Sequence, residues 1–291
     1  MKLSNKATLY LTLATLMWGI TFPVTRNALT EVDPFVFVSL RFIIASLVLL
    51  PMVWCLFYKT TKPMLLGGLI IGFLNAAAYL SQTIGLETVS SARAAFITGS
   101  SVIFVPFVAP LFKLDKPTGL DFVCALIGFS GLYVLMGLSH FHLSTGDLWV
   151  FLGAISFSFQ ITYLQRLTQA IQDYKLLAFF QLFFTIPFVS LLTKGHDFSL
   201  VFQPKALIGI LFCAVFATSL AYYLQNKYQK FTSAPKAALI FALEPVFASL
   251  FGFLINHELL PKATIYGGLL LLFSLLLPSI VSIVRESILL K

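Results

Sequence analysis

Residues 34–57 read PFVFVSLRFIIASLVLLPMVWCLF, an apolar stretch whose single charged residue is Arg41. A helix that spans a membrane needs about 20 consecutive and mostly apolar residues, and this stretch is long enough. The whole chain is similar in composition, because 59% of its 291 residues are hydrophobic and only 10% are charged. A soluble domain carries about 25% charged residues and needs its polar residues to cover its surface. We therefore predict an all-α membrane protein.

Further apolar stretches of this kind follow one another along the chain, separated by charged, Pro and Gly residues. The connections are only a few residues long, so successive helices should be antiparallel neighbours, and no soluble domain fits between them. The ten predicted transmembrane helices are 7–29, 34–57, 64–85, 91–112, 118–138, 147–169, 174–193, 205–226, 235–256 and 263–284.

The basic residues predict the orientation of these helices. With the N-terminus inside, 13 of the 19 Lys and Arg residues fall on the cytoplasmic side, five fall outside and Arg41 lies within a span. Because loops rich in Lys and Arg stay in the cytoplasm, both termini are predicted to be cytoplasmic. The net charge of +8 is spread over these connections, which favours contact with the anionic lipid of the bilayer and makes nucleic acid an unfavoured partner.

The second half of the chain repeats the first. A shift of 143 positions aligns residues 79–82 (YLSQ) with residues 222–225 (YYLQ) without a gap, and it also pairs Arg93 with Lys236. The first helix of each half aligns more weakly and at a shorter shift. Since five is an odd number, the second five helices must enter the membrane in the opposite orientation. We predict two inverted five-helix repeats, residues 1–139 and 140–291, an arrangement typical of transporters.

Several motifs carry a resemblance to a known family. The segments 18–22 (WGITF), 91–99 (SARAAFITG) and 244–247 (EPVF) resemble motifs of the drug/metabolite transporter superfamily, EamA-like branch. The resemblance covers nearly the whole chain. It implies a ten-helix permease of the bacterial inner membrane that exports amino acids, related metabolites or toxic small molecules through a central cavity between its halves. The second half shows Ser156-Phe157 near the position of Trp18-Gly19, so the two halves of the cavity are predicted to differ chemically.

Two charged residues lie inside predicted spans and well away from the span ends, where a charge is costly and a functional role is the default hypothesis. Glu244 lies near the middle of the ninth span and precedes Pro245, which removes a backbone donor. Its carboxylate is interpreted as a partner for a substrate ammonium, as a carrier of a coupling proton, or as a structural group held by neighbouring helices. Arg41 lies about 10 Å from the outer end of the second span. It either snorkels to the surface or serves as a charge partner in an ion pair or for a substrate carboxylate.

Uncharged polar and aromatic residues complete the predicted substrate cavity. An amide offers both donors and acceptors, so the repeated Gln and Tyr positions suit a zwitterion. The alternative is hydrogen bonding between helices, which contributes about 0.6 kcal/mol on average. Besides Glu244, the predicted lining is Trp18, Thr21, Asn75, Tyr79, Gln82, Ser100, Gln160, Tyr163, Tyr222 and Gln225.

The sequence has no HExxH, G-x-S-x-G, P-loop or Gly-rich dinucleotide signature. Its four His and three Cys residues are dispersed, so we expect no metal, cofactor or disulfide framework. The predicted function is a secondary transporter, and not an enzyme, that exports amino acids or related metabolites by alternating access. The alternatives are a multidrug or nucleotide-sugar carrier of the same fold, a membrane-embedded enzyme or lipid-handling protein, and a passive channel.

Overall fold

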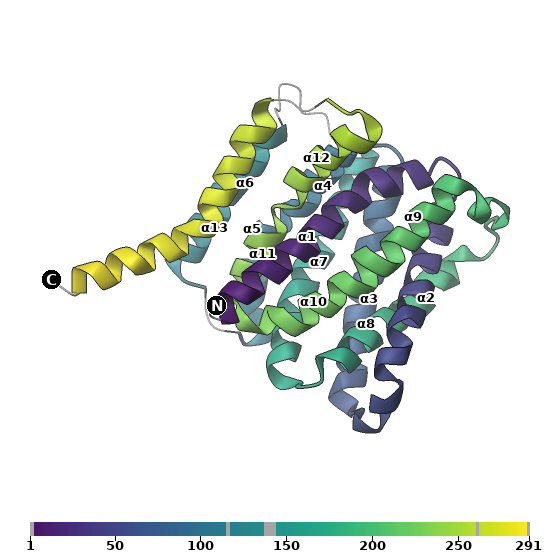
Figure 1. The fold of residues 1–291 in the computed structure, drawn as a ribbon, viewed down its shortest axis with the longest axis horizontal. Coiled ribbons are helices and arrows are strands. Elements are labelled where there is room, and N and C mark those ends of the chain that lie inside the picture. Colours follow the sequence, from purple (N-terminus) through teal and green to yellow (C-terminus); the bar gives the residue numbers. More distant parts are fainter. Residues whose placement is uncertain (1–2, 115–116, 137–143, 260–261, 290–291) are drawn as a thin grey trace.

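The computed structural model describes residues 3–114, 117–136, 144–259 and 262–289, and all regular structure within these ranges is helical. The helices lie side by side in one bundle (Figure 1). The uninterrupted long helices are α1 (Leu3–Ala28), α2 (Pro34–Val53), α3 (Lys62–Leu86), α6 (Gly119–Met136), α7 (Thr145–Ala170), α8 (Tyr174–Ser190) and α13 (Lys262–Leu289). Short 3-10 segments lie next to helices or in the connections between them: η1 (Trp54–Lys59), η2 (Ala109–Phe112), η3 (Leu191–Thr193), η4 (Ser199–Phe202) and η6 (Gln229–Phe231).

Three predicted spans are irregular in the middle. The fourth consists of α4 (Ser91–Gly99) and α5 (Ser101–Val108), and the ninth of α11 (Ala234–Phe241) and α12 (Glu244–Asn256). The eighth contains the π-helical segment η5 (Val215–Leu220) between α9 (Pro204–Ala214) and α10 (Ala221–Tyr228). All three irregularities lie well inside their spans, where a break exposes backbone groups that only protein or a water-filled cavity can satisfy.

Eight helical segments of the described chain are long and apolar enough to cross a membrane. No end of these segments differs from its predicted position by more than five residues. Two shorter apolar helices, 119–134 and 265–278, lie where the fifth and tenth spans are predicted. The prediction of an all-α membrane protein is confirmed, and the count of ten stays a prediction.

Helices of the first half pack mainly on helices of the second. The straight helix α3 contacts α7 and α8, and the segment α9–α10, which follows α3 by about 143 positions, contacts α1 and α2. In the same way α12 packs on α1, and α4 and α5 pack on α7. Helices α6 and α13 pack on each other at one edge of the bundle (Figure 1). The interior of the protein is therefore an interface between the two halves.

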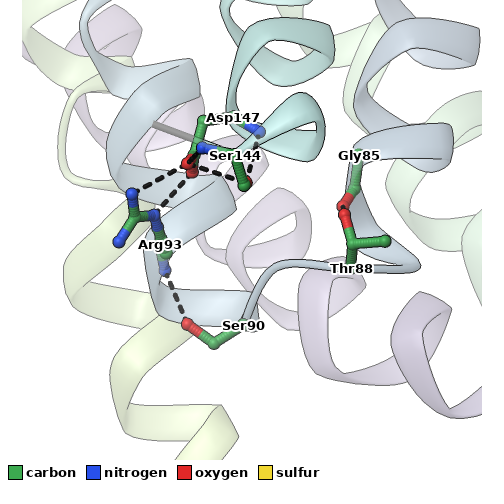
Figure 2. A network of polar contacts seen from close by, with 6 residues as sticks. All are labelled: Gly85, Thr88, Ser90, Arg93, Ser144 and Asp147. Atoms are coloured by element: carbon green, nitrogen blue, oxygen red, sulfur yellow. Dashed lines mark hydrogen bonds and ion pairs between the residues drawn. The ribbon is translucent and has the colours of Figure 1, made fainter. Parts of the chain in front are cut away.

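We call the end of the bundle where α1 begins the near end, and the end where α1 stops the far end. Figure 2 shows the main polar network of the far end. Arg93, at the start of α4, donates from Nη2 to Asp147 Oδ2 at 2.8 Å and also donates from Nε to Oδ1. Asp147 closes a capping box with Ser144 at the start of α7. Because a Cβ on Gly146 would lie only 3.0 Å from the carbonyl oxygen of Gly85, α7 approaches α3 closely here.

Further polar contacts join elements at the far end. Arg26 forms an ion pair with Glu258 at 3.2 Å, and His196 Nδ1 lies 2.9 Å from Asp33 Oδ2. At the near end, the ion pair found in the described chain joins Lys59 to Asp173 at 3.9 Å. The far end is therefore the more strongly cross-linked of the two.

Candidate functional site

A cavity of about 40 Å³ lies inside the bundle, and seven of its lining residues come from each half of the chain. A space of this size holds about three water molecules, whereas ligand pockets usually measure about 300–1,000 Å³. The structure therefore describes a compact form of the site. The lining residues are Trp18, Thr21, Tyr79, Gln82, Thr98, Gly99, Ser101, Phe157, Gln160, Ile161, Tyr222, Gln225, Phe241 and Glu244.

Corresponding positions of the two halves meet in this cavity. Helices α3, α4 and α5 correspond to α10, α11 and α12 at a shift of 143 positions, and α1 corresponds to α7 at a shift of 139. Twelve of the fourteen lining residues form six such pairs. The pairs are Trp18 with Phe157, Thr21 with Gln160, Tyr79 with Tyr222, Gln82 with Gln225, Thr98 with Phe241, and Ser101 with Glu244.

One of these pairs is in direct contact. The phenolic oxygens of Tyr79 and Tyr222 lie 3.1 Å apart, and Asn75 Oδ1 lies 3.1 Å from the Tyr222 oxygen. All three side chains are buried. Asn75 therefore supports the tyrosine pair from behind, on the α3 side, and is not part of the cavity lining.

Glu244 and Ser101 occupy equivalent places at the two helix breaks. Each is the first residue of the helix that resumes after the break, α12 for Glu244 and α5 for Ser101. Pro245 accounts for the break before α12, because proline restricts the residue before it and cannot donate. In the first half the hydroxyl of Ser100 donates to the carbonyl of Ile97 at 2.6 Å, a local bond that bends helices.

The start of α12 is a favourable place for a carboxylate, because the N-terminus of a helix carries a partial positive charge. The Glu244 side chain is nevertheless 9% exposed and faces the cavity. Within the described part of the chain it makes no ion pair or hydrogen bond. Its carboxylate is therefore available to a ligand that enters the cavity.

The amides of the two halves differ in their partners. Gln82 Nε2 donates to the hydroxyl of Thr98 at 2.9 Å. The corresponding amide, that of Gln225, meets no hydrogen-bond partner among the described residues at either its nitrogen or its oxygen. The reason is that Phe241 stands where the first half has Thr98 and offers no hydroxyl. The amide nitrogen of Gln160 is likewise without a partner in the described chain.

A hydrogen bond joins the aromatic lining to the π-helical segment. Trp18 Nε1 donates to the carbonyl of Ala217 in η5 at 2.8 Å, a carbonyl that the irregular helix leaves accessible. The Trp18 ring meets Phe241 edge-on, with centroids 5.1 Å apart, and Phe157 meets Tyr79 in the same way at 5.2 Å. Aromatic faces therefore close both sides of the cavity.

Arg41 lies behind this aromatic layer. Its side chain is only 2% exposed, so it is not a snorkelling anchor. The guanidinium carbon lies 4.5 Å from the centre of the Tyr79 ring, and Nε donates to Thr218 Oγ1 at 2.7 Å. Nη2 has no partner among the residues described. Arg41 does not line the cavity, because the Tyr79 ring lies between its guanidinium group and the cavity.

Three residues predicted to line the cavity lie outside the lining: Asn75, Ser100 and Tyr163. Ser100 bonds within its own helix, and the neighbouring Ser101 takes the place at the cavity. Tyr163 packs against Phe112, with ring centroids 5.1 Å apart. The predicted lining does not include Thr98, Gly99, Ser101, Phe157, Ile161 and Phe241, although the 143-residue shift applied to Glu244 leads directly to Ser101.

Comparison with protein families decides the class of the protein. The model of the EamA-like transporter family matches the chain twice, over residues 5–137 and 144–280. The chain belongs to the EamA-like transporter family. It is therefore a multi-pass membrane transporter with a small-molecule substrate. Among the described residues no group of three His, Cys, Asp or Glu side chains is arranged for a metal ion.

Similar proteins agree with this EamA-like assignment. An "Uncharacterized transporter" of Archaeoglobus fulgidus is 32% identical over 278 residues, which cover 94% of this chain and 86% of that protein. The "Uncharacterized transporter YvbV" of Bacillus subtilis is 24% identical over 284 residues, covering 94% and 91%. A solved structure titled "Crystal structure of protein" shares the fold, with a TM-score of 0.78, 17% identity, and coverage of 97% of this chain and 99% of that one.

Proposed function

We propose that this EamA-like protein is a secondary transporter of the bacterial inner membrane that exports amino acids or related small metabolites by alternating access. The observation that carries the proposal is the cavity lined equally by both halves. Its lining includes the Glu244 carboxylate and the Gln160 and Gln225 amides, which have unused hydrogen-bonding groups among the described residues. In the proposed topology ten helices form two inverted repeats, residues 1–139 and 140–291, with both termini in the cytoplasm. The near end of the bundle is then cytoplasmic and the far end faces outward.

Four observations support the inverted repeat. The family model matches each half separately. The helix contacts of one half recur between the corresponding helices of the other. Both breaks, after Gly99 and after Phe241, lie at corresponding positions. Tyr79 contacts its own counterpart, Tyr222, and a residue meets its symmetry mate only close to the axis that relates the two halves.

The same features support alternating access. Inverted repeats carry their substrate site near the midplane, at discontinuous helices, and the halves rock about it. Here the discontinuities bring Ser101 and Glu244 to the cavity. The ion pairs of the far end, led by Arg93 with Asp147, hold the outer side closed in this conformation. Opening outward requires these contacts to separate.

In the proposed cycle Glu244 binds the ammonium group of the substrate, and a proton competes for the same carboxylate. A carboxylate without a protein partner suits this exchange, because either occupant neutralises its charge inside the membrane. Arg41 remains fixed by Thr218 and the Tyr79 ring. Its positive charge then balances the ionised carboxylate while the site is free of substrate.

Counterflow tests the proposal. Purified protein is reconstituted into liposomes loaded with an unlabelled amino acid, and uptake of the same radiolabelled compound is followed. We expect saturable, substrate-selective counterflow for at least one compound in an amino-acid and metabolite panel. Absence of counterflow across that panel would overturn the proposed substrate class. Lipophilic cations and nucleotide sugars in the same assay test the alternative carriers of this fold.

A further inference from the structure

The polar groups of the cavity are distributed unevenly between its two sides. We call the lining residues of α1, α3, α4 and α5 the first wall, and those of α7, α10, α11 and α12 the second wall. On the first wall the hydroxyl of Thr21 donates to the carbonyl of Trp18 at 2.6 Å, and the amide nitrogen of Gln82 donates to Thr98. These donors are already used within the protein.

On the second wall the corresponding groups are unused. Gln160, which replaces Thr21, and Gln225, which corresponds to Gln82, are 2% and 1% exposed. Neither amide nitrogen finds an acceptor within the described chain, and the amide oxygen of Gln225 finds no donor there. Glu244 adds a carboxylate where the first wall has the neutral hydroxyl of Ser101. All three side chains line the same cavity.

Such an arrangement is costly unless a ligand completes it. Leaving one buried polar group unpaired costs about 1–3 kcal/mol, and unpaired groups in native proteins call for a reason such as binding. Here three unpaired amide atoms and one carboxylate lie on the same side of a small cavity. Among the described lining residues, the buried amide atoms without a partner all lie on the second wall, and this is the evidence for a polar subsite.

We propose that the second wall alone recognises the polar head group of the substrate, and that the first wall receives its apolar part. This inference rests on the proposed transport function and adds an orientation to it. The ammonium lies at Glu244, and a neighbouring carboxylate, ester or amide oxygen accepts from the amide nitrogens of Gln160 and Gln225. The aromatic faces of Trp18 and Tyr79 receive the remainder of the molecule.

The Ser101–Glu244 pair sets this orientation. If the two walls were identical, a substrate would bind equally well in two orientations related by the pseudo-twofold axis. The carboxylate on one wall, facing a neutral hydroxyl on the other, selects one of them, because an ammonium gains a charge-assisted bond only at Glu244. The chemical class of ligand is therefore a small molecule with a primary ammonium beside a hydrogen-bond acceptor.

Matched substitutions at corresponding positions test the proposal. The probes are the L-amino acid that binds wild-type protein most tightly, its methyl ester and its N-acetyl derivative, and the measurement is the dissociation constant for each. We expect Gln225→Leu to weaken binding of the amino acid at least tenfold more than Gln82→Leu does. Equal effects of these two variants would overturn the proposal.

The position of the ammonium group is tested by comparing the affinities of the three probes. In wild-type protein the N-acetyl derivative, which has no ammonium, should bind at least tenfold more weakly than the amino acid, whereas the methyl ester should retain most of its affinity. We expect Glu244→Gln to remove the discrimination against the N-acetyl form and Ser101→Ala to preserve it. Discrimination that persists in Glu244→Gln contradicts the assignment.

A second variant covers the case in which Gln225→Leu fails to fold. Phe241→Thr places a hydroxyl beside Gln225, as Thr98 stands beside Gln82, and removes no polar group. We expect it to engage the Gln225 amide and to weaken amino-acid binding at least threefold, while loss of the buried ring lowers the melting temperature. Unchanged binding would contradict a role for that amide. If wild-type protein binds none of the panel, the proposed function itself fails, which is a different outcome from equal effects on the two walls.

Discussion

The two halves of the chain place corresponding side chains around one cavity, yet they use them differently. Gln82 has a hydroxyl partner in Thr98, whereas Gln225, for which Phe241 is the residue corresponding to Thr98, has none among the described residues. Six pairs of lining residues come from corresponding positions, and in the pair that carries a charge only one member, Glu244, is ionisable. In the proposed repeat, corresponding positions supply the framework of the candidate site, and a few unequal pairs supply its chemistry.

The same contrast holds at the two ends of the bundle. Arg93 and Lys236 are corresponding residues, and each starts the helix before a break. Arg93 has the carboxylate of Asp147 as its partner, while Lys236 forms no ion pair in the part of the chain that is described. One end is therefore held by a buried carboxylate, and the equivalent position at the other end is not.

The largest effect is expected when Glu244 is made neutral, like its counterpart Ser101. Glu244→Gln makes both members of this pair neutral, and we expect it to abolish pH-driven transport while the protein still folds. The measurement is uptake into liposomes with an imposed pH gradient. Glu87→Gln, a substitution in an exposed connection, is the matched control and should retain the gradient response. If the pH dependence of Glu244→Gln equals that of wild type, the carboxylate has a structural role only.

The next largest effect is a loss of stability when the ion pair at the far end of the bundle is removed. Arg93→Met removes the partner of Asp147, whose side chain is only 1% exposed, and leaves a buried carboxylate with Ser144 as its remaining partner. Because the Arg93 side chain is 25% exposed, loss of its charged hydrogen bonds should cost about 1.5–3 kcal/mol, so the melting temperature in detergent should fall. Lys236→Met, at the corresponding position, should change stability by about 0.5 kcal/mol or less. Equal shifts for the two variants would show that the ends are held alike.

A smaller effect is expected when the first wall is made to resemble the second. Thr98→Val removes the acceptor of the Gln82 amide and leaves that buried group unpaired, at a cost of about 1–2 kcal/mol. Thermal unfolding measures the loss. The corresponding change Phe241→Leu removes no hydrogen bond, so it separates the loss of the hydroxyl from a change in packing. A Thr98→Val protein as stable as wild type would mean that the hydroxyl contributes nothing to the first wall.

The smallest effect concerns the aromatic pair. Trp18→Phe gives the first wall the same residue type as Phe157 and deprives the Ala217 carbonyl of its donor. The loss of one buried hydrogen bond should cost about 1 kcal/mol, again read from the melting temperature. An unaltered melting temperature would show that the π-helical segment does not depend on Trp18.

Much of this fold was predictable, because lipid imposes simple rules on length and composition. The second predicted span, 34–57, corresponds to a helical segment observed over 34–59, and the family assignment agrees with motifs such as Trp18-Gly19. The cavity was only partly predictable. Tyr79, Gln82 and Glu244 line it as predicted, but the predicted serine is Ser100, whereas Ser101 lines the cavity. One residue of helix rotates a side chain by about 100°, and apolar periodicity is weak in a helix that is buried on most sides.

Other features had no signal in the sequence at all. The π-helical segment over residues 215–220 contains no proline or glycine, and its residues Thr218 and Ser219 form hydrogen bonds with α2, at Arg41 and Ala45. The burial of Arg41 behind Tyr79 depends in the same way on tertiary packing. Local rules could not find either one, because both are decided by residues far away in the chain.

The small volume of the cavity has a consequence for the cell as well as for the substrate. A space of about 40 Å³ holds about three water molecules, which is too few to form a continuous file of water across the bilayer. In the proposed cycle, a carrier that changes its orientation through this compact form has no continuous path for sodium ions or protons while it does so. The proposed mechanism therefore leaves the electrical insulation of the membrane intact at this step.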